Sequence, residues 1–431
     1  MNAFISGFIT FAVFVTSLFG SFIAVEAPED KTEFTPVLRF FAASDSHVGS
    51  MGDTQSLRMQ KALKMAYAVA DSDKEYNKLD AALFAGDLTD RGRKDQFLGF
   101  AVAAKSVLRE ETQLLAVIAK SHDSSTLGKG VHSYFSGVIG EDTDIHKVIN
   151  GYHFIGLSVS KTEGEHYSDY QREWLNEQLA AATAEDPTKP VFVFQHEHVK
   201  DTVYGSSETD GWGLDVFSDV LSKYPQVVHI SGHSHFPAND PRAIWQDSFT
   251  ALNDGGLAYY ELAVDGKNGQ FPDEKDRMSQ ALIIEVDADN RVLVKVLDVD
   301  EGKIMREFLI DNITEKNKTK YSFNERKARS YAPVFPENAK LSYEKKGPLH
   351  YITVPQAKVS EDNEVFIYRI SVVNDKGKTI HKAWEFSEYF FADMPESITF
   401  DGFMTLDKSF TVKVCAEDVW GNISEELEIK V

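Results

Sequence analysis

Five short patches of aspartate and histidine occur in the first 235 residues, and such side chains are ligands of transition metals. The patches are, in chain order, DSH at 45–47, GDLTDRG at 86–92, KSHD at 120–123, QHEH at 195–198 and GHSH at 232–235. One patch alone is a weak signal, because short motifs recur by chance. Five patches together predict a metal centre.

Each patch follows a short apolar run that is typical of a buried strand. These runs are VLRFFAAS before Asp45, AALFA before Gly86, LLAVIA before Lys120, PVFVF before Gln195 and VVHIS before Gly232. Amphipathic segments between them, at 54–70 and 171–182, predict helices, with Asp53 or Thr54 as the cap of the first. The pattern predicts a layered α/β domain in which the patches gather where strands end, as ligand sites do in open sheets.

The pattern changes after Gly256 to short strands that are expected to complete a second sheet packed on the first. We predict a catalytic-type domain over 37–311, a linker over 312–336 and an all-β domain over 337–431. A sandwich of immunoglobulin or fibronectin type III kind fits the last segment best. It is expected to be a spacer or adhesion module that contacts another protein or a surface. The basic stretch at 316–329 is expected to be a solvated connection.

The N-terminus has no charged side chain from Ala3 to Val25, and residues 1–27 therefore predict a signal peptide or a membrane anchor. The protein is accordingly expected to be secreted or extracytoplasmic, or alternatively anchored, with membrane contact only through this segment. The formal net charge of −22 argues against binding to a nucleic-acid backbone. The chain has no G-x-S-x-G elbow and no phosphate-binding glycine loop after a strand.

The patches supply enough ligands for two metal ions. On an extended backbone, residues two apart face the same side, so Asp45 can act with His47, and His233 with His235. Adding Asp87 and His196 gives three donors for each of two cations if one carboxylate is shared. Mixed imidazole and carboxylate ligands suit Mn, Fe or Zn. Two such ions, about 3.5–4 Å apart, hold a hydroxide and clamp phosphoryl oxygens, which predicts hydrolysis of phosphomonoesters or phosphodiesters.

The order of the patches resembles that of the calcineurin-like metallophosphoesterase superfamily, over roughly residues 37–310. The resemblance implies a two-sheet α/β/β/α sandwich. It implies that one metal is held by Asp45, His47, Asp87 and His235, with Asp87 bridging to a second metal on His196 and His233. It further implies that His122 donates a proton to the leaving group, Asp90 orients His122 and Arg91 binds a phosphate oxygen. The stretches HFIGLSV and YPQVVHISGHSH resemble a bacterial-type group of phosphohydrolases.

The third patch departs from the family pattern Gly-Asn-His-Asp, since Lys120 and Ser121 replace the first two residues. Ser121 stands where the family has an amide ligand, and a hydroxyl is a poorer metal donor. Two hypotheses follow. In the first, the site binds one tight metal and hydrolyses slowly, with the Lys120 ammonium partly replacing the missing cation. In the second, the domain is a non-catalytic relative that binds a ligand or a partner.

Three further residues near the patches have alternative roles. His198 shares a face with His196, and a structural or pocket role is favoured over ligation. His229 lies inside a predicted strand and is expected to be a core histidine with its hydrogen bonds made. Trp212 either walls the substrate pocket or packs in the ordinary way.

Overall fold

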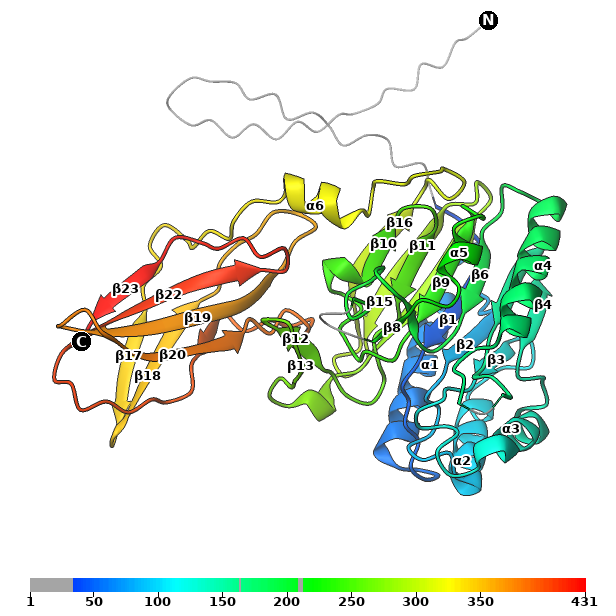
Figure 1. The fold of residues 1–431 in the computed structure, drawn as a ribbon, viewed down its shortest axis with the longest axis horizontal. Helices are drawn as coiled ribbons and strands as arrows, with labels where there is room; N and C mark the ends of the chain where they lie inside the picture. The colour runs from blue at the N-terminus through cyan, green and yellow to red at the C-terminus, as the bar shows by residue number, and fades with distance from the viewer. Residues whose placement is uncertain (1–33, 163, 208–211) are drawn as a thin grey trace, which may run out of the picture. The chain divides into compact units, whose positions relative to one another are not determined.

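Two six-stranded sheets form the core of residues 36–310 in the computed structural model, which describes residues 34–162, 164–207 and 212–431 (Figure 1). The first sheet has the order β16-β15-β14-β1-β2-β3 and contains β1 (Pro36–Ala43), β2 (Ala81–Ala85), β3 (Gln113–Val117), β14 (Gln280–Asp287), β15 (Val292–Asp298) and β16 (Lys303–Ile310). The second has the order β10-β11-β9-β6-β5-β4 and contains β4 (Ile145–Ile149), β5 (Tyr152–Gly156), β6 (Val191–Phe194), β9 (Val227–Ser231), β10 (Ile244–Gln246) and β11 (Thr250–Asn253).

The sheets pack through alternate side chains of their strands. Phe40 of β1 contacts Phe154 of β5 and Phe192 of β6, with ring centroids 5.0 and 4.7 Å apart. Its neighbour Phe41 points the other way and packs beneath the helices, because successive strand residues face opposite sides of a sheet. The predicted α/β/β/α sandwich is therefore confirmed.

The prediction that the strands after Gly256 complete the second sheet is wrong. Strand β14 pairs with β1 in antiparallel fashion, with Phe41 opposite Ile283, and β15 and β16 continue the first sheet outward. All eight residues of β14 are buried, so this strand needs neighbours on both edges and cover on both faces. The second sheet is completed instead by β10 and β11, which follow the GHSH patch directly.

Helices cover the outer faces of both sheets. The first sheet is covered by α1 (Thr54–Ser72), α2 (Lys94–Lys105) and α3 (Val131–Ile139), and the second by α4 (Asp169–Glu185) and α5 (Ser218–Leu221). Helix α1 begins after Asp53, whose carboxylate accepts a hydrogen bond from the Ser56 backbone N–H, as an N-cap does. The cap predicted for the first helix is thus Asp53. Short 3-10 turns occur at η1 (Gly128–Gly130), η2 (Pro241–Ala243) and η3 (Lys275–Arg277).

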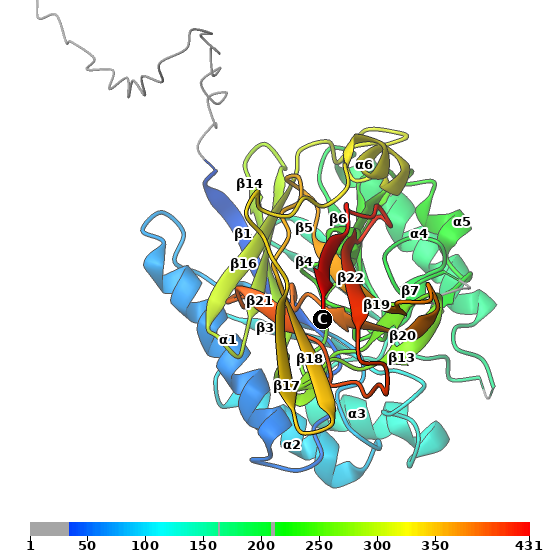
Figure 2. The same ribbon diagram turned by 90° about the vertical axis from the view of Figure 1, so that its left-hand side faces the viewer.

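The C-terminal region forms two antiparallel sheets around a separate apolar core, consistent with a β-sandwich (Figure 2). One sheet has the order β17-β18-β21, with β17 (Ser342–Lys346), β18 (Leu349–Pro355) and β21 (Ser397–Thr399). The other has the order β20-β19-β22-β23, with β19 (Val365–Asn374), β20 (Thr379–Phe386), β22 (Phe410–Asp418) and β23 (Leu427–Lys430). The immunoglobulin or fibronectin type, and the boundaries at 311 and 337, stay predictions.

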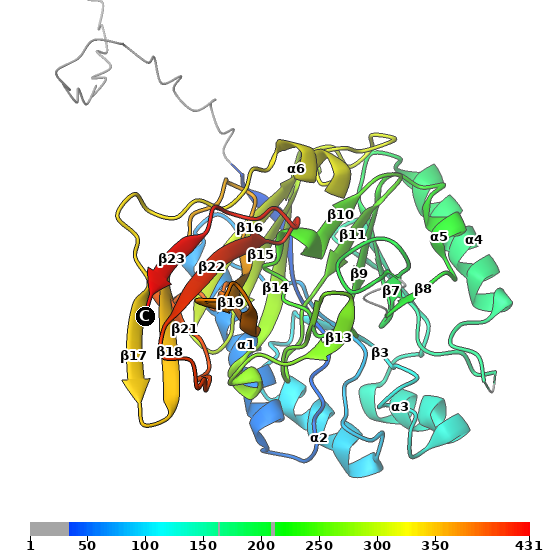
Figure 3. The same ribbon diagram turned by 60° about the vertical axis from the view of Figure 1, so that its left-hand side comes forward.

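Two small sheets lie outside these layers. One pairs β7 (His198–Val199) with β8 (Gly213–Leu214), and the other pairs β12 (Leu262–Val264) with β13 (Lys267–Gln270). The hairpin of β12 and β13 contacts the sandwich, since Asp265 in its turn forms an ion pair with Arg369 of β19 at 2.7 Å (Figure 3).

The basic stretch at 316–329 is solvated only in part, since Lys316, Lys327 and Arg329 are exposed but two other basic side chains are buried. It contains the helix α6 (Phe323–Arg329), and both Lys318 and Arg326 are 1% exposed. The Lys318 ammonium group donates to the Pro225 carbonyl oxygen at 2.7 Å, and burial lowers the pKa of Lys318 to about 8. The composition predicted exposed side chains because it does not show which distant segments supply carbonyl oxygens to the basic groups.

The predicted signal peptide or anchor at 1–27 lies outside the described residues. Within the part of the chain that the structure describes, no helix combines the length and apolar character needed to cross a bilayer.

Candidate metal centre

The five patches lie at the carboxyl ends of parallel strands. Strands β1, β2 and β3 run parallel in the first sheet and lead to Asp45, Asp87 and His122. Strands β6 and β9 run parallel in the second sheet and lead to His196 and to the GHSH patch. Because the two sheets stack face to face, these loops meet at one edge of the domain, as the apolar runs predicted.

The backbone at the ligands is left-handed rather than extended, so the geometric premise for pairing residues two apart is wrong. Positive φ values occur at Asp45 (51°), His47 (44°), Asp87 (44°), His233 (73°) and His235 (56°). A non-glycine residue in this region costs of order 1–3 kcal/mol, and such residues gather at functional sites. The pairs still converge, because the tight turns fold their side chains toward one point.

Two glycines let the loops approach closely. Gly86 has a φ of +92°, and a Cβ atom there would lie 2.7 Å from the Cβ atom of His196. A Cβ atom at Gly232 would lie 2.5 Å from Oδ2 of Asp45. The glycines that open the second and fifth patches therefore make room for metal-ligating side chains from other loops.

The first cluster contains Asp45, His47 and His235, whose ligand atoms lie within 4.8 Å of one another. The Nε2 atoms of the two histidines are 3.2 Å apart, and Oδ1 of Asp45 lies 3.2 Å from His235 Nε2 and 3.7 Å from His47 Nε2. This Oδ1 atom is buried, and no group of the described residues donates a hydrogen bond to it. Converging lone pairs around a buried carboxylate oxygen fit a divalent cation.

The second cluster contains Asp87, His196 and His233, again within 4.8 Å. His196 Nε2 lies 3.2 Å from Asp87 Oδ2 and 3.1 Å from His233 Nδ1. It also lies 3.9 Å from Asp45 Oδ1, so the two clusters adjoin at Asp45. All six ligands predicted from the Asp and His patterns are brought together, in two groups of three, while the bridging role of Asp87 stays a prediction.

The charges of the site suit cation binding. Burial raises the pKa of Asp45, but His235 and His196 outweigh it and hold that pKa well below its usual range. Burial lowers the pKa of His233 to about 4, which leaves this imidazole neutral near pH 7. Burial lowers the pKa of His196 and of His235, but the charges of Asp45 and Asp87 outweigh it and raise both values, so these two rings carry protons that a bound cation would displace.

His198 does not belong to either cluster. Its Nδ1 atom is 2.8 Å from the Ser231 hydroxyl and its Nε2 atom is 2.8 Å from the Ser234 hydroxyl. Both ring nitrogens are engaged, so the residue ties the fourth patch to the end of β9 and to the fifth patch. The structural role favoured by the sequence agrees with these contacts.

The third patch contacts the second cluster through Ser121. The Ser121 hydroxyl lies 2.8 and 2.9 Å from the two carboxylate oxygens of Asp87, and the His122 backbone N–H donates to the same group at 3.2 Å. The Lys120 ammonium group instead donates to the Gly164 carbonyl oxygen at 2.8 Å. Ser121 therefore lies where a second-metal ligand is expected, whereas the contact of Lys120 gives no support to its ammonium replacing a cation.

His122 is held by the backbone of the second patch. Its Nδ1 atom lies 2.7 Å from the Asp90 carbonyl oxygen, and its ring packs edge-on against His47 with centroids 4.4 Å apart. A carbonyl oxygen only accepts, so Nδ1 carries the proton and Nε2 remains for a reacting group. The Asp90 carboxylate pairs with Arg91 at 3.1 Å, and the Arg91 side chain is 74% exposed. The contact between Asp90 and His122 is thus made by the Asp90 carbonyl oxygen and not by its carboxylate, and the orienting role of Asp90 stays a prediction.

Two buried acidic residues support the site, and the sequence predicted a role for neither. Asp123 accepts hydrogen bonds from the backbone N–H groups of Leu88, Thr89 and Ala119, which ties the second patch to the third. Burial, helped by the charge of Asp87, raises the pKa of Asp123 to about 7. The KSHD patch contained Asp123 but gave no role for it.

Asp254 is the second such acid. The Ser44 hydroxyl donates to Asp254 at 2.6 Å and also contacts the Asp45 carboxylate. Burial raises the pKa of Asp254 well above its usual value, so it is a neutral acid behind Asp45. It follows β11 and belongs to no motif, so only the fold brings it to the site.

Aromatic rings flank the two clusters. Trp212 is 37% exposed and packs edge-on against His233, with ring centroids 5.3 Å apart. Tyr259 stacks on His235 at 4.0 Å, and its carbonyl oxygen lies 3.1 Å from His235 Nδ1. The position of Trp212 fits a wall of the site better than a packing role within the core.

Comparison with known proteins agrees with this geometry. Residues 38–237, which include all five patches, match the sequence model of the calcineurin-like phosphoesterase family. A probable cyclic nucleotide phosphodiesterase of Rhodococcus erythropolis is 31% identical over 165 residues, which cover 36% of this chain and 52% of that protein. The match thus spans about half of that relative's length.

Two solved structures are similar at low sequence identity. The purple acid phosphatase from yellow lupin (Lupinus luteus) seeds is 13% identical, with a TM-score of 0.45, over 63% of this chain and 53% of that chain. The phosphopantetheinyl hydrolase of Mycobacterium tuberculosis is 15% identical, with a TM-score of 0.29, over 50% of this chain and 89% of that chain.

Proposed function

We propose that the protein uses residues 38–237, which match the calcineurin-like phosphoesterase family, to hydrolyse phosphoesters with one or two divalent transition metal ions. The observation that carries the proposal is the pair of adjoining Asp/His clusters, with the buried Oδ1 atom of Asp45 between them. Their mixed imidazole and carboxylate ligands favour Mn, Fe or Zn.

Each group of residues has a role in this proposal. Bound divalent ions acidify water and stabilise charge on phosphoryl oxygens. Asp45, His47 and His235 hold one ion. His122 keeps its Nδ1 proton on the Asp90 carbonyl oxygen, and in its imidazolium form it would give the second proton, on Nε2, to the leaving oxygen. The exposed Arg91 guanidinium contacts a phosphate oxygen when substrate enters.

We propose phosphodiesters as the first substrate class to examine. The support is the likeness to the probable cyclic nucleotide phosphodiesterase, which covers only part of each chain. Trp212 beside His233 supplies a ring on which a planar leaving group can stack. Phosphomonoesters form the comparison class, because the ligand clusters alone do not separate the two.

We propose that Ser121 lowers the occupancy of the second cluster. Its hydroxyl reaches Asp87 but is a weaker metal donor than an amide oxygen. Ser121→Asn is therefore expected to raise the metal content toward two ions per chain and to increase turnover. Ser121→Ala is the matched control, because it removes the hydroxyl without supplying an amide. Equal metal content in the Asn and Ala variants would contradict this role.

The test of the function combines metal analysis with turnover. The full chain is loaded with Mn, Fe or Zn, its bound metal is counted, and hydrolysis of bis(p-nitrophenyl) phosphate and p-nitrophenyl phosphate is measured. His122→Ala should keep the metal and lose most of the turnover, by about 100-fold or more. Absence of turnover with less than one ion per chain would exclude the enzyme. Metal binding without turnover would instead identify a non-catalytic relative.

We also propose that the protein acts outside the cytoplasm. The support is the uncharged run from Ala3 to Val25. Cell fractionation of the full-length chain tests this, and recovery of the protein only in the cytoplasmic fraction would contradict it.

A further inference from the structure

The C-terminal sandwich contacts the loop that carries His233 and His235. Its segment 387–391, which follows β20, lies against Asn239, Asp240, Tyr260 and Gln280 of the phosphoesterase domain. We propose that this segment of the sandwich is a positioning element for the metal ligand His235. The inference rests on the proposed function in one respect, namely that His235 holds a metal ion.

The first connection is a buried pair of hydrogen bonds. The Tyr389 hydroxyl donates to Asp240 Oδ2 at 2.6 Å, and the Asn239 side-chain amide donates to the Tyr389 carbonyl oxygen at 2.9 Å. Asp240 is fully buried, and its other strong partner is Arg242 at 2.7 Å. Asn239 and Asp240 follow His235 by four and five residues. A group of the sandwich thus completes the hydrogen bonding of the loop that ends the fifth patch.

The second connection passes through Gln280 at the start of β14. Its side-chain oxygen accepts from the Ala238 backbone N–H at 2.7 Å, and its side-chain nitrogen lies 2.9 Å from Asn239 Oδ1. The same nitrogen lies 3.3 Å from the Phe390 carbonyl oxygen. Gln280 therefore joins the ligand loop, the first sheet and the sandwich.

The third connection reaches the far side of the His235 ring. Phe390 packs edge-on against the fully buried Tyr260, with ring centroids 6.4 Å apart. Tyr260 lies between Tyr259, whose carbonyl oxygen is 3.1 Å from His235 Nδ1, and Glu261, whose backbone N–H donates to the His235 carbonyl oxygen at 3.0 Å. The segment that sets the tautomer and direction of His235 is thus anchored on the sandwich.

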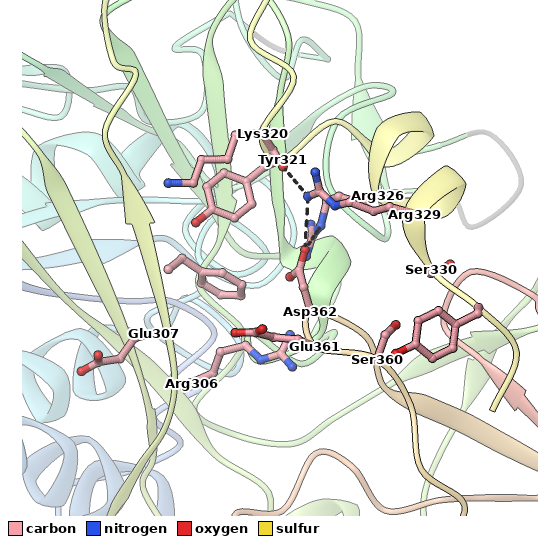
Figure 4. A pocket seen from close by; sticks show the side chains of 12 residues that line it. Arg306, Glu307, Lys320, Tyr321, Arg326, Arg329, Ser330, Ser360, Glu361 and Asp362 are labelled. Atoms are coloured by element: carbon pink, nitrogen blue, oxygen red, sulfur yellow. Dashed lines mark hydrogen bonds and ion pairs between the residues drawn. The ribbon is translucent and has the colours of Figure 1, made fainter. Parts of the chain in front are cut away.

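A separate contact holds the residue that follows Asp240. Arg326 of α6 pairs with Asp362 through two hydrogen bonds, of 2.8 and 2.6 Å (Figure 4). Arg326 also donates to the Pro241 carbonyl oxygen. Asp362 belongs to the sandwich and Pro241 to the loop after the fifth patch. Three consecutive residues after the fifth patch, Asn239, Asp240 and Pro241, are therefore held by groups outside the phosphoesterase sheets.

These contacts matter for metal affinity because a ligating histidine depends on the acceptor at its other ring nitrogen. Loss of such an outer partner typically weakens metal binding about 10–100-fold. Tyr389 acts through Asn239 and Asp240, so it is a positioning residue, and we expect an effect of about 10-fold, at the low end of that range.

The experiment uses Tyr389→Phe in the full chain, which removes one hydroxyl group and keeps the ring. Tyr343→Phe is the matched control, because the Tyr343 hydroxyl bonds within the sandwich, to His350 at 2.9 Å, and to no other group of the described residues. The readouts are the dissociation constant for Mn²⁺, the visible absorption of the Co²⁺-loaded protein, and hydrogen exchange of residues 232–240 without metal. Mn²⁺ binding is expected to weaken about 10-fold in Tyr389→Phe and to stay unchanged in Tyr343→Phe.

The outcomes separate this inference from the proposed function. Wild-type Mn²⁺ affinity and wild-type exchange in Tyr389→Phe would overturn the inference, even if the protein hydrolyses phosphoesters. Weakened binding in Tyr389→Phe would uphold it, even if the wild type turns over no substrate. Equal loss of affinity in both variants would overturn it, since it would show a general effect of destabilising the sandwich. Should Tyr389→Phe fail to fold, Phe390→Leu gives the same comparison through Tyr260.

Discussion

The buried His229 makes a quantitative prediction about acid stability. It lies in β9 beside Val193 of β6 and Ala251 of β11, on the face that packs beneath α4 and α5. Neither ring nitrogen has a hydrogen-bond partner within the described ranges of the chain, contrary to the expectation of a core histidine with its bonds made. Burial lowers the pKa of His229 to about 3.

The fold loses stability in acid because His229 binds a proton more readily in the unfolded chain than in the folded one. The unfolded chain binds a proton at His229 below pH 6.5, whereas the fold keeps the ring neutral down to about pH 3. Stability is therefore unaffected above pH 6.5 and is lost as the pH falls from 6.5 toward 3. The loss from this one group is about 0.1 kcal/mol at pH 7.5 and about 2 kcal/mol at pH 5.0.

His229→Leu removes both the titration and the unpaired nitrogens. At pH 7.5 we expect the variant to be more stable than the wild type by about 1–2 kcal/mol, because two unsatisfied polar atoms disappear. At pH 5.0 the advantage should grow by about 2 kcal/mol more. His229→Gln is the control, since it keeps a buried polar group that does not titrate. It should gain the pH-dependent part alone.

The assay is urea unfolding of the metal-free full chain, followed by tryptophan fluorescence at pH 7.5 and 5.0. The difference between each variant and the wild type cancels the contributions of all other titrating groups. If that difference is the same at the two pH values, His229 binds its proton equally in both states, and the reasoning is wrong.

Three further predictions concern the site. Asp123→Ala should destabilise the protein by about 3 kcal/mol, because it leaves the buried N–H groups of Leu88, Thr89 and Ala119 unpaired. Thermal unfolding measures this loss, and an unchanged midpoint of unfolding would refute the role of Asp123. Trp212→Ala should raise the KM for an aryl phosphodiester several-fold at an unchanged midpoint of unfolding, and an unchanged KM would remove Trp212 from the substrate pocket. If the protein is first held at a free Mn²⁺ concentration 100 times the Kd, removal of the metal with EDTA should lower the free energy of unfolding by about 3 kcal/mol. Calorimetry with and without Mn²⁺ measures this difference.

The candidate metal ligands were predictable from sequence because they directly follow buried strands. A buried apolar run followed by Asp or His places that side chain at a sheet edge, whatever the remaining topology. Asp45, Asp87 and His196 satisfy this rule, and the structure brings them together. The rule did not need the correct backbone conformation, which is why the wrong premise of an extended chain led to the right residues.

Contacts between distant segments were not predictable. Asp254 lies more than 200 residues from Ser44 in the chain, and only the pairing of β11 with β9 brings them together. The apolar pattern of β14 fits an inner position in either sheet, so it does not determine that β14 pairs with β1. The buried contact of Tyr389 with Asp240 depends on a surface of the sandwich that has no motif.

The left-handed backbone at the five ligand positions also limits which sequences can evolve at this site. Aspartate and histidine, with asparagine, are the non-glycine residues that adopt this conformation most readily, so one choice of residue serves both the turn and the metal. A change to asparagine or glycine keeps the turn and alters only the chemistry. A change to valine or isoleucine disturbs both together. Divergence toward a non-catalytic relative can therefore proceed in small steps through asparagine, whereas steps through β-branched residues would be eliminated by misfolding first.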